Sequence, residues 1–283
     1  MSTSPPPFPR SVVVTRLRAA GCVFAEDEAQ LLIAAARTSD DLADMVDRRA
    51  AGVPLEHVLG WALFLGLRIA VDPGVFVPRR RTEFLVRQGV VLARASAGRG
   101  GQGLASPRAA VVVDLCCGSG AVGVALVAAL DRAELHAVDI DSAAVRCAHR
   151  NVSAAGGRVY EGDLYEPLPP ALRGRVDILV ANAPYVPTRA IGLLPAEARV
   201  HEPLVALDGG ADGLDVLRRV TADAPRWLAP GGHLLFETSE RQAPHGVEIV
   251  ARSGLIPRVA SSEELSATVV IGTSPAGPNR RGG

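Results

Sequence analysis

Hydrophobic residues in the first part of the chain recur at the spacing of an α-helix. Residues 26–38 carry apolar positions at this spacing, and residues 38–52 begin with helix-capping side chains and end on Gly52. A small helical domain is therefore predicted over residues 10–60.

The pattern changes to that of β-strands near residue 64. Two runs of β-type residues flank Asp72-Pro73-Gly74, a sequence that is typical of a turn. A β-hairpin linker is predicted over residues 61–80, and residues 81–95 again have the pattern of a helix.

From residue 109 onward, short apolar runs follow one another with helical segments between most of them. Strands that alternate with helices indicate an α/β fold with a parallel sheet that is covered on both faces. We expect this second domain to extend over residues 81–272. The apolar runs are residues 109–115, 135–140, 158–163, 176–184, 231–238 and 267–272.

Three segments have no such pattern. Residues 96–108 are rich in glycine and serine and are predicted to be a mobile loop. The proline-rich leader over residues 1–9 and the tail over residues 273–283 are predicted to be disordered.

Composition narrows the class of protein. The 283 residues carry a formal net charge of zero, so a bulk electrostatic grip on nucleic acid is not indicated. No apolar run approaches the roughly 20 residues of a membrane span, and the leader has no apolar core like that of a secretory signal. The four cysteines do not match zinc spacings, and no metal is assigned. We expect a cytoplasmic monomer.

Residues 111–126 read as a strand, a glycine loop and a helix. Gly118, Gly120 and Gly123 have the G-x-G-x-x-G spacing, so spacing alone is compatible with a dinucleotide such as NAD. Asp114 stands at the strand end before this loop, where a carboxylate would repel a pyrophosphate. The same carboxylate can pair with a cation, which favours S-adenosylmethionine, because that cofactor carries an ammonium and a sulfonium.

Two further carboxylates follow the next two strands. Asp139 comes about 20 residues after the loop, where an acidic residue can accept from both ribose hydroxyls; the helix-capping role suits Asp141 better. Asp163 could accept from the adenine amino group, although a turn aspartate is an alternative when it is read alone. The predicted donor-binding residues are Asp114, Cys116, Gly118, Gly120, Asp139, Ile140, Asp163, Leu164 and Asn182.

The fourth apolar run ends in Asn182-Ala183-Pro184-Tyr185, where we place the acceptor. The side-chain oxygen of Asn182 and the carbonyl of Ala183 can accept both hydrogens of a planar amino group. Pro184 restricts Ala183 to extended backbone angles, and Tyr185 offers a face for a flat group. A strand followed by an Asx/Pro turn is an equal alternative for these four residues alone.

The sequence resembles the HemK family of protein-(glutamine) methyltransferases from about residue 10 to residue 272. The resemblance implies a seven-stranded, Rossmann-like, S-adenosylmethionine-dependent methyltransferase sheet with an N-terminal helical domain for substrate recognition. It also implies methylation of a glutamine side-chain nitrogen in a release factor or, in one branch, a ribosomal protein. The segments that carry the resemblance are residues 54–86, "DLCCGSG", "AVDID", "GDLYEPL", "NAPY", "EPLVALDGGADGLDVLRR" and "LAPGGHLLFETSERQ".

Two residues depart from the family pattern. Ala183 stands where the family has the first proline of Asn-Pro-Pro-Tyr, and this costs preorganisation on the order of 0.4–1 kcal/mol. Arg81 stands where the family usually has an acidic residue, and this change could alter the protein surface that the enzyme recognises. Together with Ala183, it leaves the identity of the substrate undetermined. Thr82 matches the family pattern near the donor, with a capped helix start as the alternative. Glu237 is expected to be a solvated strand end, with a hydrogen-bond acceptor behind the site as the alternative.

Other interpretations stay open. The two-acceptor grip also suits the exocyclic amino group of a nucleic-acid base, and a noncatalytic donor-binding protein is a further alternative. The predicted mobile loop contains Gly100-Gly101-Gln102, the tripeptide that the family methylates in release factors. Coincidence in a glycine-rich loop is one explanation of this tripeptide, and methylation of Gln102 is the other.

Overall fold

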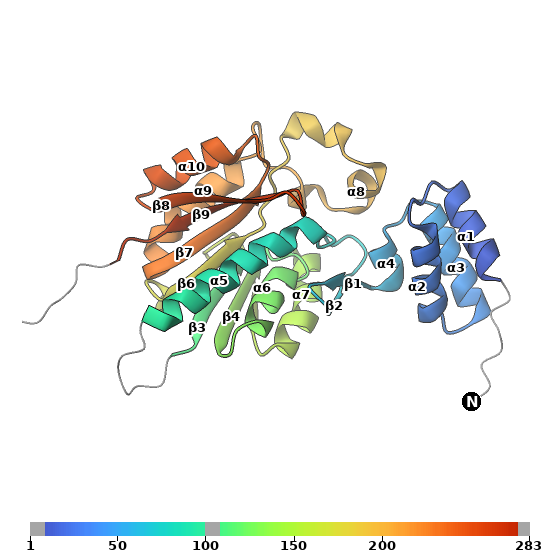
Figure 1. Cartoon of the computed structure of the whole chain (residues 1–283), viewed down its shortest axis with the longest axis horizontal. Coiled ribbons are helices and arrows are strands. Elements are labelled where there is room, and N and C mark those ends of the chain that lie inside the picture. Colours follow the sequence, from blue (N-terminus) through green and yellow to red (C-terminus); the bar gives the residue numbers. More distant parts are fainter. Residues whose placement is uncertain (1–8, 100–107, 277–283) are drawn as a thin grey trace, which may run out of the picture.

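The computed structural model describes residues 9–99 and 108–276 (Figure 1). The predictions for the remaining residues, including Gln102, lie outside this described part. No helix in the described ranges is long and apolar enough to cross a membrane.

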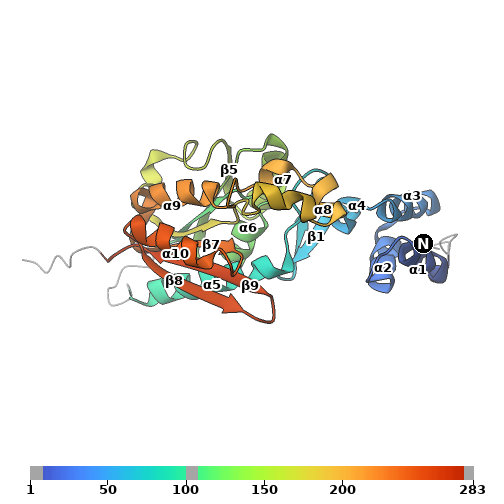
Figure 2. The same cartoon turned by 90° about the horizontal axis from the view of Figure 1, so that it is seen from above.

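The N-terminal helices form a small domain that stands at one end of the molecule (Figures 1 and 2). Leu17, Leu32 and Leu42 are fully buried in its core. The side chain of Thr38 caps the third helix by accepting from the backbone N–H of Asp41 at 3.1 Å. The helices are α1 (Arg10–Ala19), α2 (Ala25–Ala35), α3 (Ser39–Ala50) and α4 (Leu55–Leu59).

A short antiparallel hairpin connects this domain to the sheet, but its turn is not the predicted one. Strands β1 (Trp61–Phe64) and β2 (Leu67–Ala70) are joined at Leu65-Gly66, and both turn residues have positive φ, 49° and 78°. Positive φ at both central positions matches the twist of a two-residue hairpin. A β-hairpin thus lies within residues 61–80, as predicted, but the expected position of its turn at residues 72–74 was wrong, because that segment follows β2 and leads toward the first helix of the larger domain.

The larger domain contains a seven-stranded sheet in the order β5-β4-β3-β6-β7-β9-β8, which confirms the predicted fold class. The first five strands in this order are parallel, whereas β9 is antiparallel to both neighbours. The sheet is therefore not wholly parallel, and the polar strand β8 escaped prediction. The strands are β3 (Ala110–Leu115), β4 (Ala133–Asp139), β5 (Arg158–Glu161), β6 (Val176–Ala181), β7 (Leu228–Thr238), β8 (Ile256–Ser262) and β9 (Ala267–Thr273).

Helices cover both faces of this sheet because successive strand residues point to opposite sides. Val112 belongs to a core with α5, α6 and α7, while its neighbour Val113 belongs to a core with α9 and α10. Helix α5 extends to Arg99. Residues 96–99 are therefore helical, and the predicted start of the mobile loop at residue 96 was wrong. The helices are α5 (Glu83–Arg99), α6 (Ala121–Ala128), α7 (Ser142–Ala154), α8 (Ala196–His201), α9 (Asp215–Trp227) and α10 (Ala243–Arg252).

The carboxyl ends of the parallel strands lie along one edge of the sheet. Leu115 pairs with Val138 of β4 and with Ala181 of β6, and Asp139 pairs with Glu161 of β5. Ligands of open α/β sheets bind outside this edge.

Asn151 of α7 joins the hairpin to the glycine loop at this edge. Its amide nitrogen donates to the carbonyls of Ala70 at 2.9 Å and Ser119 at 2.8 Å, and its oxygen accepts from the N–H of Ala70 at 2.9 Å. The side chain thus pairs with backbone groups of both segments.

We expect Asn151→Ala to lower the free energy of unfolding by about 1–3 kcal/mol, because it leaves these backbone groups without partners. Chemical denaturation would measure the change. Arg146→Ala on the same helix is the matched control, since Arg146 is exposed and its side chain reaches only Ser142; its effect should stay within about 0.5 kcal/mol. Equal effects of the two substitutions would contradict the role of Asn151.

Candidate active site

A cavity of about 250 Å³ lies at the carboxyl edge of the sheet, bounded by the loops after β3, β4 and β5. Eight of the nine predicted donor-binding residues line it. Gly120 does not; it begins α6 with φ of 78°, and a Cβ there would approach Val152 to 2.6 Å. Its glycine is required by close helix packing. The eight lining residues are Asp114, Cys116, Gly118, Asp139, Ile140, Asp163, Leu164 and Asn182.

Asp114 is a buried carboxyl group with one unused oxygen. Oδ2 accepts from the N–H of Gly123 at 2.8 Å, while Oδ1 is buried and has no partner. The pKa of Asp114 is raised to about 7, mainly by burial and in part by the nearby charge of Asp139, against the lowering effect of the Gly123 hydrogen bond. An orphan acceptor of this kind fits a cationic ligand group.

Asp139 is held by backbone donors on both sides. Its Oδ2 accepts from Gly118 at 2.8 Å and its Oδ1 accepts from Asp141 at 2.9 Å. Burial raises its pKa, and these two hydrogen bonds oppose that rise. Because each carboxylate oxygen has a second lone pair, the fixed side chain can still accept from two hydroxyls.

Asp163 has a partner that sequence reasoning missed. Arg219 of α9 donates to its Oδ2 at 2.6 Å and also lines the cavity. The pair leaves Oδ1 as the free acceptor beside Leu164, which adopts a positive φ of 50°. Arg219 lies 56 residues along the chain from Asp163, so no local pattern could reveal it.

Cys116 and Cys117 also line the cavity, where burial raises the pKa of both thiols above their ordinary value. The two groups are therefore neutral thiols rather than nucleophilic thiolates. The described residues contain no group of three or more side chains that could hold a metal ion.

A second cavity of about 240 Å³ adjoins the first at the end of β6. Asn182, Pro184, Phe76 and Ala206 line both cavities. The side chain of Asn182 makes no hydrogen bond with any other residue that the structure describes. A polar amide without a protein partner, placed between two cavities, is free to hold a ligand.

Tyr185 stands at the wall of this second cavity and is fixed from behind. Its hydroxyl donates to Oε1 of Glu237 at 2.8 Å, and Nε of Arg81 donates to the same oxygen at 2.9 Å. Glu237 is 2% exposed, so the expectation of a solvated strand end was wrong. Burial, with the charge of Glu237, raises the pKa of Tyr185 far above its ordinary value, so the phenol is neutral.

Arg81 therefore belongs to the second cavity as well as to the surface. It lines the second cavity and is the counter-ion of buried Glu237. An acidic side chain at position 81 would instead place two carboxylates together, which is costly in a buried setting. The departure at residue 81 thus changes the interior of the site.

Arg79 and Thr82, which stand just before α5, also line the cavities. Arg79 contacts both oxygens of Glu202 at 2.6 Å, and Glu202 also accepts from the N–H of Val77 at 3.1 Å. The loop after β6 is thereby tied across the cavities. The hydroxyl of Thr82 is buried without a partner and lines the first cavity, which makes it a second orphan group available to a ligand.

Comparisons with known proteins agree with this geometry. Residues 102–211 match the family described as "Methyltransferase small domain". The catalytic domain of hMettl16, solved with the MAT2A 3'UTR hairpin 6, has the same fold, with a TM-score of 0.54 at 15% identity over 82% of each chain. The chain thus contains a segment that matches a methyltransferase family and shares the fold of the hMettl16 catalytic domain.

Sequence relatives place it more narrowly. The release factor glutamine methyltransferase of Geobacter sulfurreducens is 37% identical over 230 residues, which are 81% of this chain and 75% of that protein. The chain belongs to this family of S-adenosylmethionine-dependent methyltransferases. A further relative is the 4-amino-L-phenylalanine/4-methylamino-L-phenylalanine methyltransferase of Streptomyces pristinaespiralis, 38% identical over 70% of this chain and 65% of that protein.

We expect the affinity for S-adenosylmethionine to rise as pH increases from about 5.5 to 7. The carboxyl of Asp114, with a pKa of about 7, is mostly neutral at the lower pH and becomes ionised, while the donor amine stays protonated below its own pKa of about 8. The rise should approach about tenfold per pH unit at most, measured by calorimetry.

Asp114→Asn should bind the donor weakly and with no pH slope over this range. Asp223→Asn, at an exposed ion pair of α9, is the control that should keep the wild-type slope. A slope that persists in Asp114→Asn would assign the titration to another group.

Proposed function

We propose that the protein transfers the methyl group of S-adenosylmethionine to the side-chain amide nitrogen of a glutamine in a translation protein, with a release factor as the first candidate. The observation that carries this proposal is the place of Asn182, whose unpartnered amide lines both cavities. The name of the Geobacter relative supports the choice of substrate.

The first cavity is the proposed donor site. The free oxygen of Asp114 would pair with the donor ammonium, Asp139 would accept from the ribose hydroxyls, and Asp163 would accept from the adenine amino group. Ile140, 56% exposed, and Leu164 would pack on the base. The donor supplies a methyl group on a sulfonium, which needs no activation by the protein.

The second cavity is the proposed acceptor site. Oδ1 of Asn182 and the carbonyl of Ala183 would each accept one hydrogen of the acceptor amide, which turns the nitrogen lone pair toward the first cavity. An amide nitrogen is a weak nucleophile, so orientation and stabilisation of the developing positive charge must supply the rate. Tyr185, held by Glu237, would support the flat amide. The arrangement requires no general base.

The residues proposed for both cavities all belong to one chain, so neither proposed site needs a residue from a second copy. Translation proteins are the proposed acceptors, so the protein would act in the cytoplasm.

An aromatic amine is the second candidate acceptor, because the Streptomyces relative is named for 4-amino-L-phenylalanine. The same two-acceptor grip suits an aryl amine or the amino group of a base, since these groups are also planar. Radiolabelled methyl transfer into a cell lysate, followed by protease and nuclease digestion, separates the outcomes. Label in peptide supports the proposal, whereas label in nucleic acid, in small molecules or in nothing contradicts it.

We expect Asn182→Ala to lower kcat on a Gly-Gly-Gln peptide by about 10²–10³, because one of the two acceptors is lost. Donor affinity should stay within about twofold, since Asp114 and Asp139 remain. Calorimetry with the donor and methyl incorporation into the peptide would check both expectations. Undiminished turnover would remove the assigned role of Asn182.

The N-terminal helical domain is proposed to position the protein substrate relative to the acceptor cavity. Arg49 of α3 binds Glu28 of α2 at 2.6 Å and Glu197 of α8 at 2.9 Å. Glu197 lines the acceptor cavity, so this ion pair couples the orientation of the helical domain to the wall of the site.

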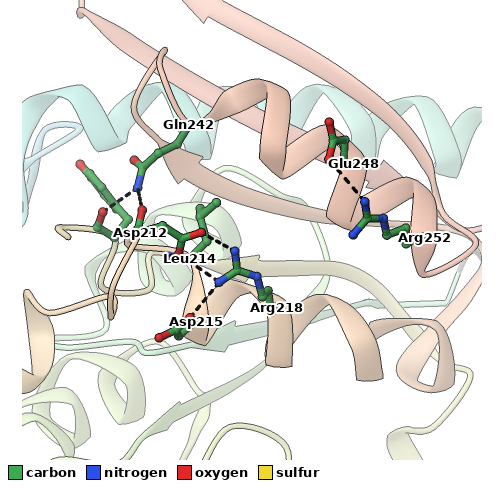
Figure 3. Close-up of polar contacts among 8 residues, drawn as sticks. Asp212, Leu214, Asp215, Arg218, Gln242, Glu248 and Arg252 are labelled. Carbon is green, nitrogen blue, oxygen red and sulfur yellow. Dashed lines mark hydrogen bonds and ion pairs between the residues drawn. The ribbon is translucent and has the colours of Figure 1, made fainter. Parts of the chain in front are cut away.

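We expect Glu197→Gln to raise KM for a whole protein acceptor by about two- to fivefold, the worth of one partly exposed ion pair, and to leave KM for a short peptide unchanged. Arg49 keeps Glu28, so the helical domain stays folded. Glu248→Gln is the matched control, because Glu248 pairs with Arg252 on the surface of α10, away from Asp212 and the loop around it (Figure 3). Parallel changes with both acceptors would contradict a positioning role.

A further inference from the structure

Both the nitrogen and the oxygen of the Gln242 side-chain amide are hydrogen-bonded. The amide nitrogen links two loops that are far apart in the sequence. Gln242 precedes α10, and its Nε2 donates to the carbonyl of Tyr185 at 2.9 Å and to the carbonyl of Asp212 at 3.0 Å (Figure 3). Its Oε1 accepts from the hydroxyl of Ser239 at 2.6 Å. With both ends of the amide bonded, its orientation is fixed.

The loop that supplies the second carbonyl is itself braced. Asp212 accepts from the N–H of Leu214 at 3.1 Å and pairs with Arg218, which also reaches Asp215 at 2.8 Å (Figure 3). Hydrogen bonding to Arg218 lowers the pKa of Asp212 to about 2, so its carboxylate is ionised at neutral pH. Gln242 therefore ties Tyr185 to a loop that has hydrogen bonds and ion pairs of its own.

This loop approaches the acceptor turn so closely that only glycine fits. A Cβ at Gly213 would lie 2.3 Å from the carbonyl oxygen of Tyr185, and a Cβ at Gly209 would lie 2.7 Å from that of Pro184. Gly209 also donates to the carbonyl of Val186 at 2.9 Å. The backbone of residues 184–186 is thus held from outside by Gln242 and by the 207–213 loop.

The acceptor turn needs external support because residue 183 is alanine. A proline ring would fix φ at this position near −65°, whereas alanine, which Pro184 confines only to extended angles, retains a wider range of φ. Ala183 is 1% exposed, and its N–H donates to no residue in the described part of the chain, so a proline would lose no hydrogen bond there. The direction of the Ala183 carbonyl therefore depends on the backbone angles of Ala183 and on how the backbone of Tyr185 is held.

We infer that Gln242 is a positioning residue for methyl transfer, which holds the Asn182–Tyr185 turn in the orientation that a proline at position 183 would impose. This inference rests on the proposed function, because it assumes that the Ala183 carbonyl grips the acceptor amide. Gln242 does not touch the acceptor; it acts through the Tyr185 carbonyl. Its loss should misdirect one acceptor oxygen and leave the donor cavity intact.

The test is a double-mutant cycle between Gln242→Met and Ala183→Pro on the full chain. Methionine keeps the length of glutamine but cannot donate, so Q242M should lower kcat on a Gly-Gly-Gln peptide by about tenfold, since small displacements at a reacting group are costly. In the A183P background the same substitution should cost less than about threefold. Donor affinity, measured by calorimetry, should change by less than about twofold throughout.

Gln88→Met is the matched control, because Gln88 of α5 makes no hydrogen bond within the described ranges and lines neither cavity. It should leave kcat unchanged. An equal loss from Q242M in both backgrounds, no loss in either, or a parallel loss of donor affinity would each overturn the inference.

Backbone hydrogen exchange separates this inference from the proposed function. The N–H of Val186 donates to the carbonyl of Leu207 at 3.1 Å, and its exchange should become faster in Q242M and slow again in Q242M with A183P. If the wild-type protein methylates no peptide, the proposed function fails, and the exchange rates still decide whether Gln242 fixes the turn. Unchanged exchange in Q242M would overturn the inference.

Discussion

The register of the parallel strands is the constraint on which the site depends. Because β3 pairs in step with β4 and β6, the residues that follow these strands meet along one edge, although more than 60 residues separate Asp114 from Asn182. A shift of one residue in any pair would turn the corresponding side chain to the other face of the sheet. The buried valines of β3 alternate between two helical layers and thereby exclude such a shift.

Several polar groups at this edge are buried without full pairing. Asp114 Oδ1, the Thr82 hydroxyl and Glu237 Oε2 all lack partners in the described structure. Unpaired buried polar atoms lower stability by about 1–3 kcal/mol each. Two of these groups, on Asp114 and Thr82, belong to residues that line the first cavity, where a ligand can pair with them. The ligand would recover part of this cost by completing the hydrogen bonds of Asp114 and Thr82.

The turn over residues 182–185 shows how a backbone segment can be held by contacts from outside rather than by its own rigidity. Ala183 gives the turn no ring constraint, and its neighbours are fixed by contacts from three other segments: Glu237 on β7, Gln242 before α10 and Gly209 in the loop after α8. Arg81 completes this support by providing the charge opposite Glu237. The two departures from the family pattern, at residues 81 and 183, therefore lie in one small region around the acceptor cavity.

Sequence alone determined the parts of the protein that local rules control. The alternation of apolar runs, the glycine loop and the carboxylates after successive strands were sufficient for the fold class and for most of the polar residues that line the first cavity, because strand ends and helix starts have short-range signatures. Which side chains pair with one another in the site was decided only by the tertiary structure. The pairing of Asp163 with Arg219 and the burial of Glu237 could not be predicted, since they join segments more than 50 residues apart. Distance in sequence carries no information about such contacts, which exist only once the sheet has brought its strand ends together.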